Sequence, residues 1–164
     1  MTLAAPGPID DAHDIGSFDS GVQTLDDWLK RRAKGNQASG ASRAYVVCED
    51  RRVVAYYALA AGGVDLVTAP GRVRRNMPDP VPISVLGRFA INKAYQKRGL
   101  GRALVQDAGR RVMQAADIIG IRALVVHAIS EEAKAFYLAV GFEASPLQPL
   151  TLMATLADLK AGGA

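Results

Sequence analysis

The sequence predicts a mixed α/β fold built around one strand–helix–strand unit. Three observations lead to this prediction: a mainly apolar run from Ile83 to Ile91, a long helical pattern from Gly99 to about Ile119, and a wholly apolar run over Ala123–Val126. A helix that connects two strands of one sheet implies that the strands are parallel. The absence of polar residues from the second run is typical of a strand that is buried on both faces.

The segments before this unit predict one helix and one hairpin. Ser20 is placed to cap a helix to about Lys34, with an apolar stripe that includes Leu25, Trp28 and Leu29. The polar, glycine-rich residues 35–42 predict a loop. Two apolar runs, 44–48 and 53–60, flank a polar turn and predict a β-hairpin. Residues 62–82 hold four prolines and several glycines, so they are expected to be mostly loop.

The segments after the unit predict a helix and two short strands. The helix is expected from Glu131 to Val140, where Gly141 ends it. The final strands are expected at residues 142–144 and 151–155.

Length and composition fit one globular domain over residues 1–164. The chain has 164 residues, of which 49% are hydrophobic and 22% charged, and it shows no repeat or low-complexity tract. The single cysteine, Cys48, excludes an internal disulfide and suits a reducing compartment. No basic residue precedes Lys30, as a secretory signal would need, and no apolar run reaches the ~20 residues of a membrane span. We therefore expect a cytoplasmic protein without membrane contact.

The charges are distributed unevenly along the chain. Residues 1–29 carry six acids and no lysine or arginine, so residues 30–164 carry all 20 basic residues and the other 10 acids, a balance of +10. This positive charge fits a polyanionic partner, such as a phosphate-rich coenzyme or a nucleic acid. It fits a well-solvated surface without such a partner equally well.

A glycine-rich segment, Gln96-Lys97-Arg98-Gly99-Leu100-Gly101-Arg102, lies between the first strand of the central unit and its helix. The first N–H groups of a helix have no partner inside it and lie at the positive end of its dipole, which makes an anion site. Glycines lack a Cβ and let a phosphate approach the backbone, although they also serve as simple caps. No Lys-Ser/Thr follows the second glycine and position 104 is Leu, so the segment is neither a Walker loop nor the dinucleotide fingerprint.

Together with a second motif, this segment resembles the GNAT acetyltransferase superfamily. Gln-x-x-Gly-x-Gly after the apolar run Leu86–Ile91 is similar to the acyl-CoA pyrophosphate loop of that family. Residues 132–142, with Phe136-Tyr137 followed by Gly141-Phe142, resemble its second hallmark. The resemblance implies a GNAT fold, with a mixed central sheet, a splayed parallel strand pair and flanking helices. It also implies acetyl-CoA as co-substrate.

The first half of the chain resembles one branch of the family, the GNAT-fold toxins of type II toxin–antitoxin modules. The similar residues include Ser20-Gly21, the run Leu25–Leu29, Arg31-Arg32-Ala33 and the hairpin strands. This resemblance implies acetylation of the α-amino group of an aminoacyl-tRNA, which blocks translation. It also implies a ribbon-helix-helix antitoxin partner and a homodimer.

The resemblance also implies a division of roles among residues. The pantetheine arm is expected beside Phe89, Ala90 and Ile91, where their strand splays from the strand of residues 124–126, and one N–H there is expected to polarise the thioester carbonyl. Tyr137 is the expected general acid for the departing thiolate, with packing of the helix as the alternative. Phe136 is expected at the coenzyme cleft. Ser130 stands where the family often has an asparagine, so it either contacts the coenzyme or only caps the helix.

Several basic residues are candidates for substrate contacts. Arg88 lies in an apolar strand and is either a member of a buried salt bridge or a group that faces a substrate phosphate. Arg72, Arg74 and Arg75 precede that strand and either grip RNA or are solvated. His13, His127 and Cys48 show no ligand spacing, so no metal site is expected. Two further readings stay open: an acetyltransferase for a small or protein amine, and a non-enzymatic acyl-CoA-binding module.

Overall fold

The computed structural model describes residues 3–162, which divide into two compact units. Unit 1 holds residues 3–60 and 87–104, and unit 2 holds residues 61–86 and 105–162. Two strands, β3 (Arg52–Val64) and β4 (Val81–Ile91), and one helix, α4 (Leu100–Ala116), each run from one unit into the other. One domain over residues 1–164 therefore stays a prediction.

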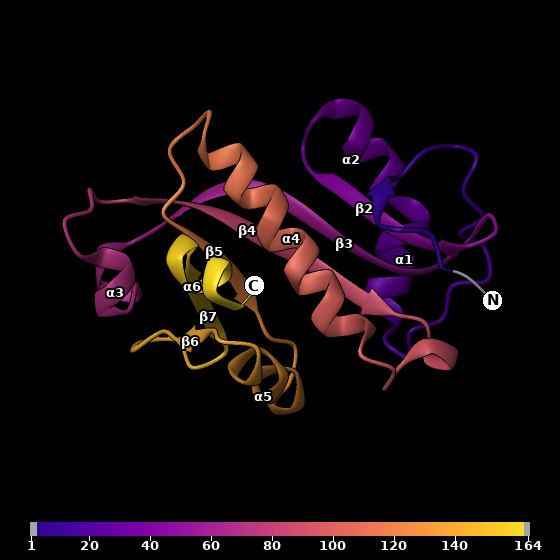
Figure 1. Cartoon of the computed structure of the whole chain (residues 1–164). Helices are drawn as coiled ribbons and strands as arrows, with labels where there is room; N and C mark the ends of the chain where they lie inside the picture. Colours follow the sequence, from indigo (N-terminus) through magenta and orange to yellow (C-terminus); the bar gives the residue numbers. More distant parts are fainter. Residues whose placement is uncertain (1–2, 163–164) are drawn as a thin grey trace. The chain divides into compact units, whose positions relative to one another are not determined.

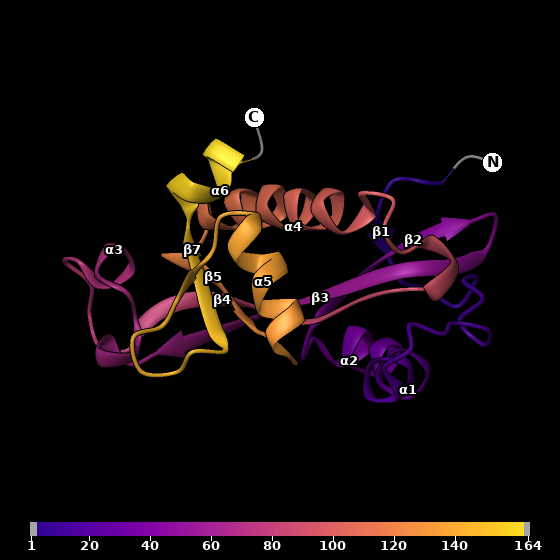
Figure 2. The ribbon, with the colours of Figure 1, turned by 90° about the horizontal axis from the view of Figure 1, so that it is seen from below.

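Unit 1 is an antiparallel sheet that carries two helices. β1 (Gly7–Pro8) pairs with β2 (Arg43–Glu49), which pairs with β3 in a register that includes Tyr45–Tyr57. The helices α1 (Gln23–Arg31) and α2 (Ala33–Ser39) lie together beside β2 and β3, as Figure 2 shows. The core that they enclose includes Phe18, Leu25, Leu29 and Tyr56, all buried. The predicted hairpin is thus confirmed.

Two details of the first helix prediction are wrong. Ser20 does not cap α1, because its hydroxyl donates to the buried Asp26 carboxylate at 2.6 Å and the cap position is Val22. The expected loop at residues 35–42 is mostly helix α2, which ends at Gly40 with a left-handed φ of 82°. A glycine at the end of a helix stabilises this conformation, and Gly35 is exposed within the helix.

Unit 2 contains the parallel pair that the central unit predicts. β4 pairs in parallel with β5 (Ala123–His127), from Ile83–Ala123 to Leu86–Val126. β5 pairs antiparallel with β7 (Thr151–Thr155), and β7 pairs with β6 (Glu143–Ala144). Figure 1 shows β5 and β7 side by side. The hydrogen-bonded strand order is β1-β2-β3-β4-β5-β7-β6, so the mixed α/β fold class is confirmed.

Three helices of unit 2 contact β7: α3 (Gly71–Arg74), α5 (Glu131–Ala139) and α6 (Leu156–Gly162). The stop at Gly141 is confirmed, since its φ is +108°. Helix α4 ends at Ala116 rather than near Ile119, because the chain turns there and leaves Ile118 and Ile119 exposed. Helix α6 was not expected from the sequence. No helix among residues 3–162 is long and apolar enough to cross a membrane.

Candidate active site

The glycine-rich segment of unit 1 joins β4 to α4 and adopts an unusual backbone. A short 3-10 turn, η2 (Lys93–Tyr95), comes first, and the Asn92 side chain caps it by accepting from the Ala94 N–H at 3.0 Å. Lys97 then has a φ of 63° and Gly99 a φ of 79°. Positive φ is uncommon for a residue with a Cβ, and such residues cluster at ligand-binding sites.

This backbone leaves a cluster of N–H groups open to an anion. Among residues 3–162, no hydrogen-bond acceptor is paired with the backbone N–H groups of residues 98–101. Residues 98 and 99 precede α4, and residues 100 and 101 begin it. A Cβ placed on Gly99 would have no atom within 4 Å, so the space beside it is open. The side chains of Lys97, Arg98 and Arg102 are exposed around it. Open N–H groups with nearby cations fit a pyrophosphate, which is the group that the sequence motif predicts here.

The Gln96 side chain anchors the segment to the rest of unit 1. Its Nε2 donates to the Ile91 carbonyl at 2.7 Å and to the Ser20 carbonyl at 2.9 Å. Both amide N–H donors of this side chain are therefore used within the protein. Gln96, predicted as a coenzyme contact, acts in this structure as a support of the loop.

Tyr95 supports the same loop through a contact of its ring with Arg98. The Arg98 guanidinium lies over the Tyr95 ring at 5.3 Å from its centroid. The Tyr95 hydroxyl donates to Glu49 at 2.5 Å and accepts from Arg52 at 3.3 Å, and both partners lie on the β2–β3 hairpin. A buried ring held by charged partners restricts the position of Arg98. The role of Tyr95 was not predicted from the sequence, because its contacts with residues more than 40 positions away leave no local signal.

Arg88 is not part of a buried salt bridge, so that alternative is wrong. Its side chain is exposed, as is the neighbouring Gly87 of β4, and its guanidinium lies over the Trp28 ring at 5.7 Å from the ring centroid. Trp28 stacks in turn on Tyr56 at 5.8 Å, and the Tyr56 hydroxyl donates to the Leu25 carbonyl at 2.6 Å. Burial raises the pKa of Tyr56, an effect that Arg88 partly offsets. Arg88 therefore keeps its charge on the surface, where a phosphate can reach it.

Tyr137 lies in unit 2, buried between two other aromatic rings. Its ring meets Phe136 edge-on at 5.3 Å and Phe142 at 5.6 Å, and 7% of the residue is exposed. Burial raises the pKa of Tyr137 to about 12. The hydroxyl therefore stays protonated at neutral pH, as both a hydrogen-bond donor and a general acid require.

Ser130 caps the helix that carries Tyr137. Its Oγ accepts from the Ala133 N–H at 3.1 Å, which is the capping alternative. The hydroxyl hydrogen is not used in that bond, so Ser130 can still donate to a ligand.

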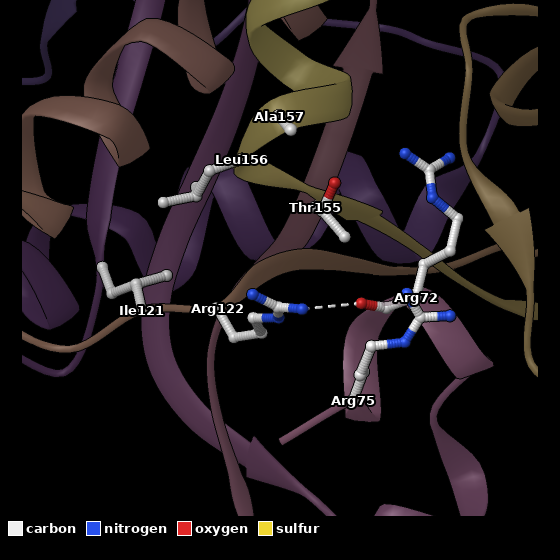
Figure 3. Close-up of a pocket in the computed structure, with 7 residues that line it drawn as sticks. All are labelled: Arg72, Arg75, Ile121, Arg122, Thr155, Leu156 and Ala157. Atoms are coloured by element: carbon white, nitrogen blue, oxygen red, sulfur yellow. Dashed lines mark hydrogen bonds between the residues drawn. The ribbon is translucent and has the colours of Figure 1, made fainter. Parts of the chain in front are cut away.

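The three arginines expected to bind RNA separate in unit 2. Arg72 and Arg75 line an open pocket of about 290 Å³, together with Arg122, which the sequence analysis missed (Figure 3). Arg74 is exposed but does not line the pocket. Arg122 stands immediately before β5, and a charge next to an apolar strand is the local signal by which it could have been found.

The remaining candidates have structural roles. His13 accepts from the Asp10 N–H, and His127 contacts Thr151. Cys48 is buried, and burial raises the pKa of its thiol, which makes it a poor nucleophile. Within residues 3–162, no group of three or more His, Cys, Asp or Glu side chains is arranged to hold a metal ion.

Comparison with known proteins identifies similar proteins over nearly the whole chain. The profile of the acetyltransferase (GNAT) domain matches residues 40–144. A tRNA-acetylating toxin of Mycobacterium tuberculosis (strain ATCC 25618 / H37Rv) is 53% identical over 158 residues, which cover 96% of this chain and 95% of that protein.

Two solved structures agree with this result. The toxin AtaT complexed with acetyl-methionyl-tRNAfMet superimposes with a TM-score of 0.89 at 26% identity, over 98% of each chain. A tyrosine-to-phenylalanine mutant of AtaT, bound to the C-terminus of the antitoxin AtaR and to acetyl-CoA, has a TM-score of 0.82 at 27% identity. The match covers 98% of this chain and 97% of that one.

Proposed function

The chain belongs to the GNAT acetyltransferase family, and from this premise we propose that it moves an acetyl group from acetyl-CoA to the α-amino group of an aminoacyl-tRNA, as a toxin. The observation that carries the proposal is the 53% identity, spread over 96% of the chain, with a tRNA-acetylating toxin. The basic balance of residues 30–164 supports a polyanionic substrate.

The residues proposed to hold the coenzyme follow from the loop geometry. Acetyl-CoA supplies the activated acetyl group when it is bound. The open N–H groups of residues 98–101 would donate to its pyrophosphate, and Lys97, Arg98 and Arg102 would add positive charge. The further proposed contacts are Phe89, Ala90, Ile91, Ser130 and Phe136, while Gln96 keeps the loop in place.

Tyr137 is the proposed general acid, which donates its hydroxyl proton to the departing thiolate. The support is a buried hydroxyl whose pKa of about 12 keeps it protonated. A thiol has a pKa of about 8.5, so a free thiolate is a weaker base than the Tyr137 phenolate and would not readily take the Tyr137 proton after it has left. We infer that the amine nitrogen bonds to the acetyl carbon and gives up a proton to solvent, that the Tyr137 proton moves to sulfur as the carbon–sulfur bond breaks, and that solvent then reprotonates Tyr137.

The biological setting proposed is that of a toxin–antitoxin module. Acetylation of aminoacyl-tRNA would block translation, and a ribbon-helix-helix antitoxin would neutralise the toxin. The structure of AtaT with the C-terminus of AtaR supports an antitoxin of some kind. A homodimer and a cytoplasmic location complete the proposal.

The first test is transfer of labelled acetyl from acetyl-CoA to purified charged tRNAs, in parallel with lysine, polyamines and a peptide amine. We expect label on the aminoacyl end of one or a few tRNAs, strongly reduced in Tyr137→Phe. Tyr45→Phe is the matched control, because Tyr45 is a half-buried tyrosine on β2 that packs against Tyr57.

Each other outcome would select a different function. Label only on small or peptide amines would leave an acetyltransferase and overturn the toxin. Binding of coenzyme without any transfer would instead indicate a non-enzymatic acyl-CoA-binding module.

A further inference from the structure

The pocket in unit 2 is lined on one side by arginines and on the other by apolar side chains. We name Arg72, Arg75, Arg122 and Thr155 the arginine pocket; Ile121 and Leu156 face them in Figure 3. These residues lie in α3 or directly after it, directly before β5, and at the junction of β7 with α6. The pocket shares no residue with the glycine-rich loop, and nothing in the coenzyme motif accounts for it.

The backbone holds Arg122 without neutralising it. Its Nε donates to the Val73 carbonyl at 3.0 Å and its Nη2 donates to the Arg72 carbonyl at 2.8 Å, the bond drawn in Figure 3. Carbonyl oxygens carry no net charge, so the guanidinium remains a full cation. Its position is restricted by two bonds to α3, which suits it to bind an anion without further ordering.

The acids near the pocket do not balance its arginines. Arg72 pairs with Asp158 at 2.5 Å, and the Asp158 carboxylate also accepts from the Thr155 N–H at 3.1 Å. The Arg75 side chain is exposed, and among the residues that the structure describes it forms no hydrogen bond or ion pair. One carboxylate therefore faces three guanidinium groups, which leaves two positive charges without an acidic partner.

We propose that the arginine pocket binds a phosphate group of the RNA substrate, with Arg75 and Arg122 as its charged contacts. This inference rests on the proposed function, and it goes further by assigning a place where the RNA backbone is held. A guanidinium donates two parallel hydrogen bonds to phosphate oxygens, and such contacts fix the register of a nucleic acid. A volume of about 290 Å³ is at the lower end of ligand pockets, and it suits a phosphate with its sugar rather than a whole coenzyme.

An RNA fits the surroundings better than an isolated anion. Arg74, on the same helix as Arg72, is also exposed, so the cations continue beyond the pocket. An extended polyanion can contact them in series, each contact releasing a counterion.

The test is binding of a fluorescein-labelled RNA hairpin, followed by anisotropy over a series of salt concentrations with the full chain. The variants are Arg75→Gln, Arg75→Glu and, as a control, Lys160→Glu. Lys160→Glu makes the same change of charge on an exposed residue of unit 2 that does not line the pocket. Arg122 is left intact because its bonds to α3 are structural.

We expect Arg75→Glu to raise the Kd for the hairpin about tenfold or more, because a charged hydrogen-bonded contact is replaced by repulsion. Arg75→Gln should give a smaller increase, and the slope of log K against log salt should fall by about one. Lys160→Glu should change the Kd less than threefold. The Kd for acetyl-CoA, measured by calorimetry, should be the same in all variants.

Binding of RNA separates failure of this inference from failure of the proposed function. If Arg75→Glu binds the hairpin as tightly as the native chain at every salt concentration, the inference is overturned, whatever the enzyme acetylates. If Arg75→Glu weakens binding of the hairpin while the native chain acetylates no charged tRNA, the RNA-binding role of the pocket is supported and the proposed function is wrong. If Arg75→Glu instead weakens binding of an octaglutamate peptide but not of the hairpin, the pocket binds an acidic protein and the inference is wrong.

Discussion

The anchoring role of Gln96 leads to a prediction that opposes the usual view of a residue in a coenzyme motif. In Gln96→Ala both hydrogen bonds of Nε2 are lost, those to Ile91 at 2.7 Å and to Ser20 at 2.9 Å. Each is worth about 0.5–1.5 kcal/mol, so the free energy of unfolding should fall by about 1–3 kcal/mol. Both bonds are partly open to solvent, which favours the lower half of this range.

The measurement is denaturant and thermal unfolding of the chain without coenzyme. For a chain of this length, a loss of 2 kcal/mol lowers the Tm by about 4–8 °C. Gln96→Glu should destabilise at least as much at pH 7, because the new carboxylate faces two carbonyl oxygens. The difference in free energy of unfolding between Gln96→Glu and the native chain should become smaller on acidification, since protonation of this carboxyl restores one donor. The KM for acetyl-CoA should rise in both variants, because the loop loses its support.

One pattern of results would contradict the anchoring role of Gln96. If Gln96→Ala left the unfolding curve of the free chain unchanged and raised only the KM for acetyl-CoA, the side chain would contact the coenzyme directly. The two carbonyls would then have other partners in solution.

Three further predictions concern single side chains. Ser130→Ala removes the cap of α5 and should lower the free energy of unfolding by about 1 kcal/mol, measured by thermal unfolding. Ser130→Asp should retain the cap. Equal stability of the native chain and both variants would count against a cap. Tyr56→Phe leaves the Leu25 carbonyl without its 2.6 Å donor and should cost about 1–3 kcal/mol in denaturant unfolding, and a loss below 0.5 kcal/mol would mean that water replaces the hydroxyl. The pKa of Tyr137 is raised from 10 to about 12, so the neutral side chain stabilises the fold below pH 10 and this stability declines as the pH rises through 12. The decline, about 2 kcal/mol in urea unfolding between pH 9 and pH 12, should be smaller in Tyr137→Phe, and identical pH profiles would contradict the buried hydroxyl.

The order of elements was predictable because it depends on local patterns. The run from Ile83 to Ile91, the helix that begins at Leu100 and the run at 123–126 each carry their own periodicity, and all three exist close to where they were expected. Segments whose stability comes from tertiary packing were predicted poorly. Helix α2 contains Gly35 and has weak local propensity, and α6 is short, so neither shows a clear signal alone.

The sequence by itself determined the composition of the glycine-rich loop, because the spacing of its glycines and cations along the chain sets which N–H groups and charges follow β4. Only the tertiary structure decided what the surrounding side chains do. Gln96 is an anchor because the carbonyls of Ser20 and Ile91 lie beside it, and Ser20 pairs with Asp26 instead of capping a helix. Arg75 and Arg122 meet in one pocket although 46 residues separate them along the chain. Such contacts depend on chain folding over long sequence separations, which no local pattern of residues encodes.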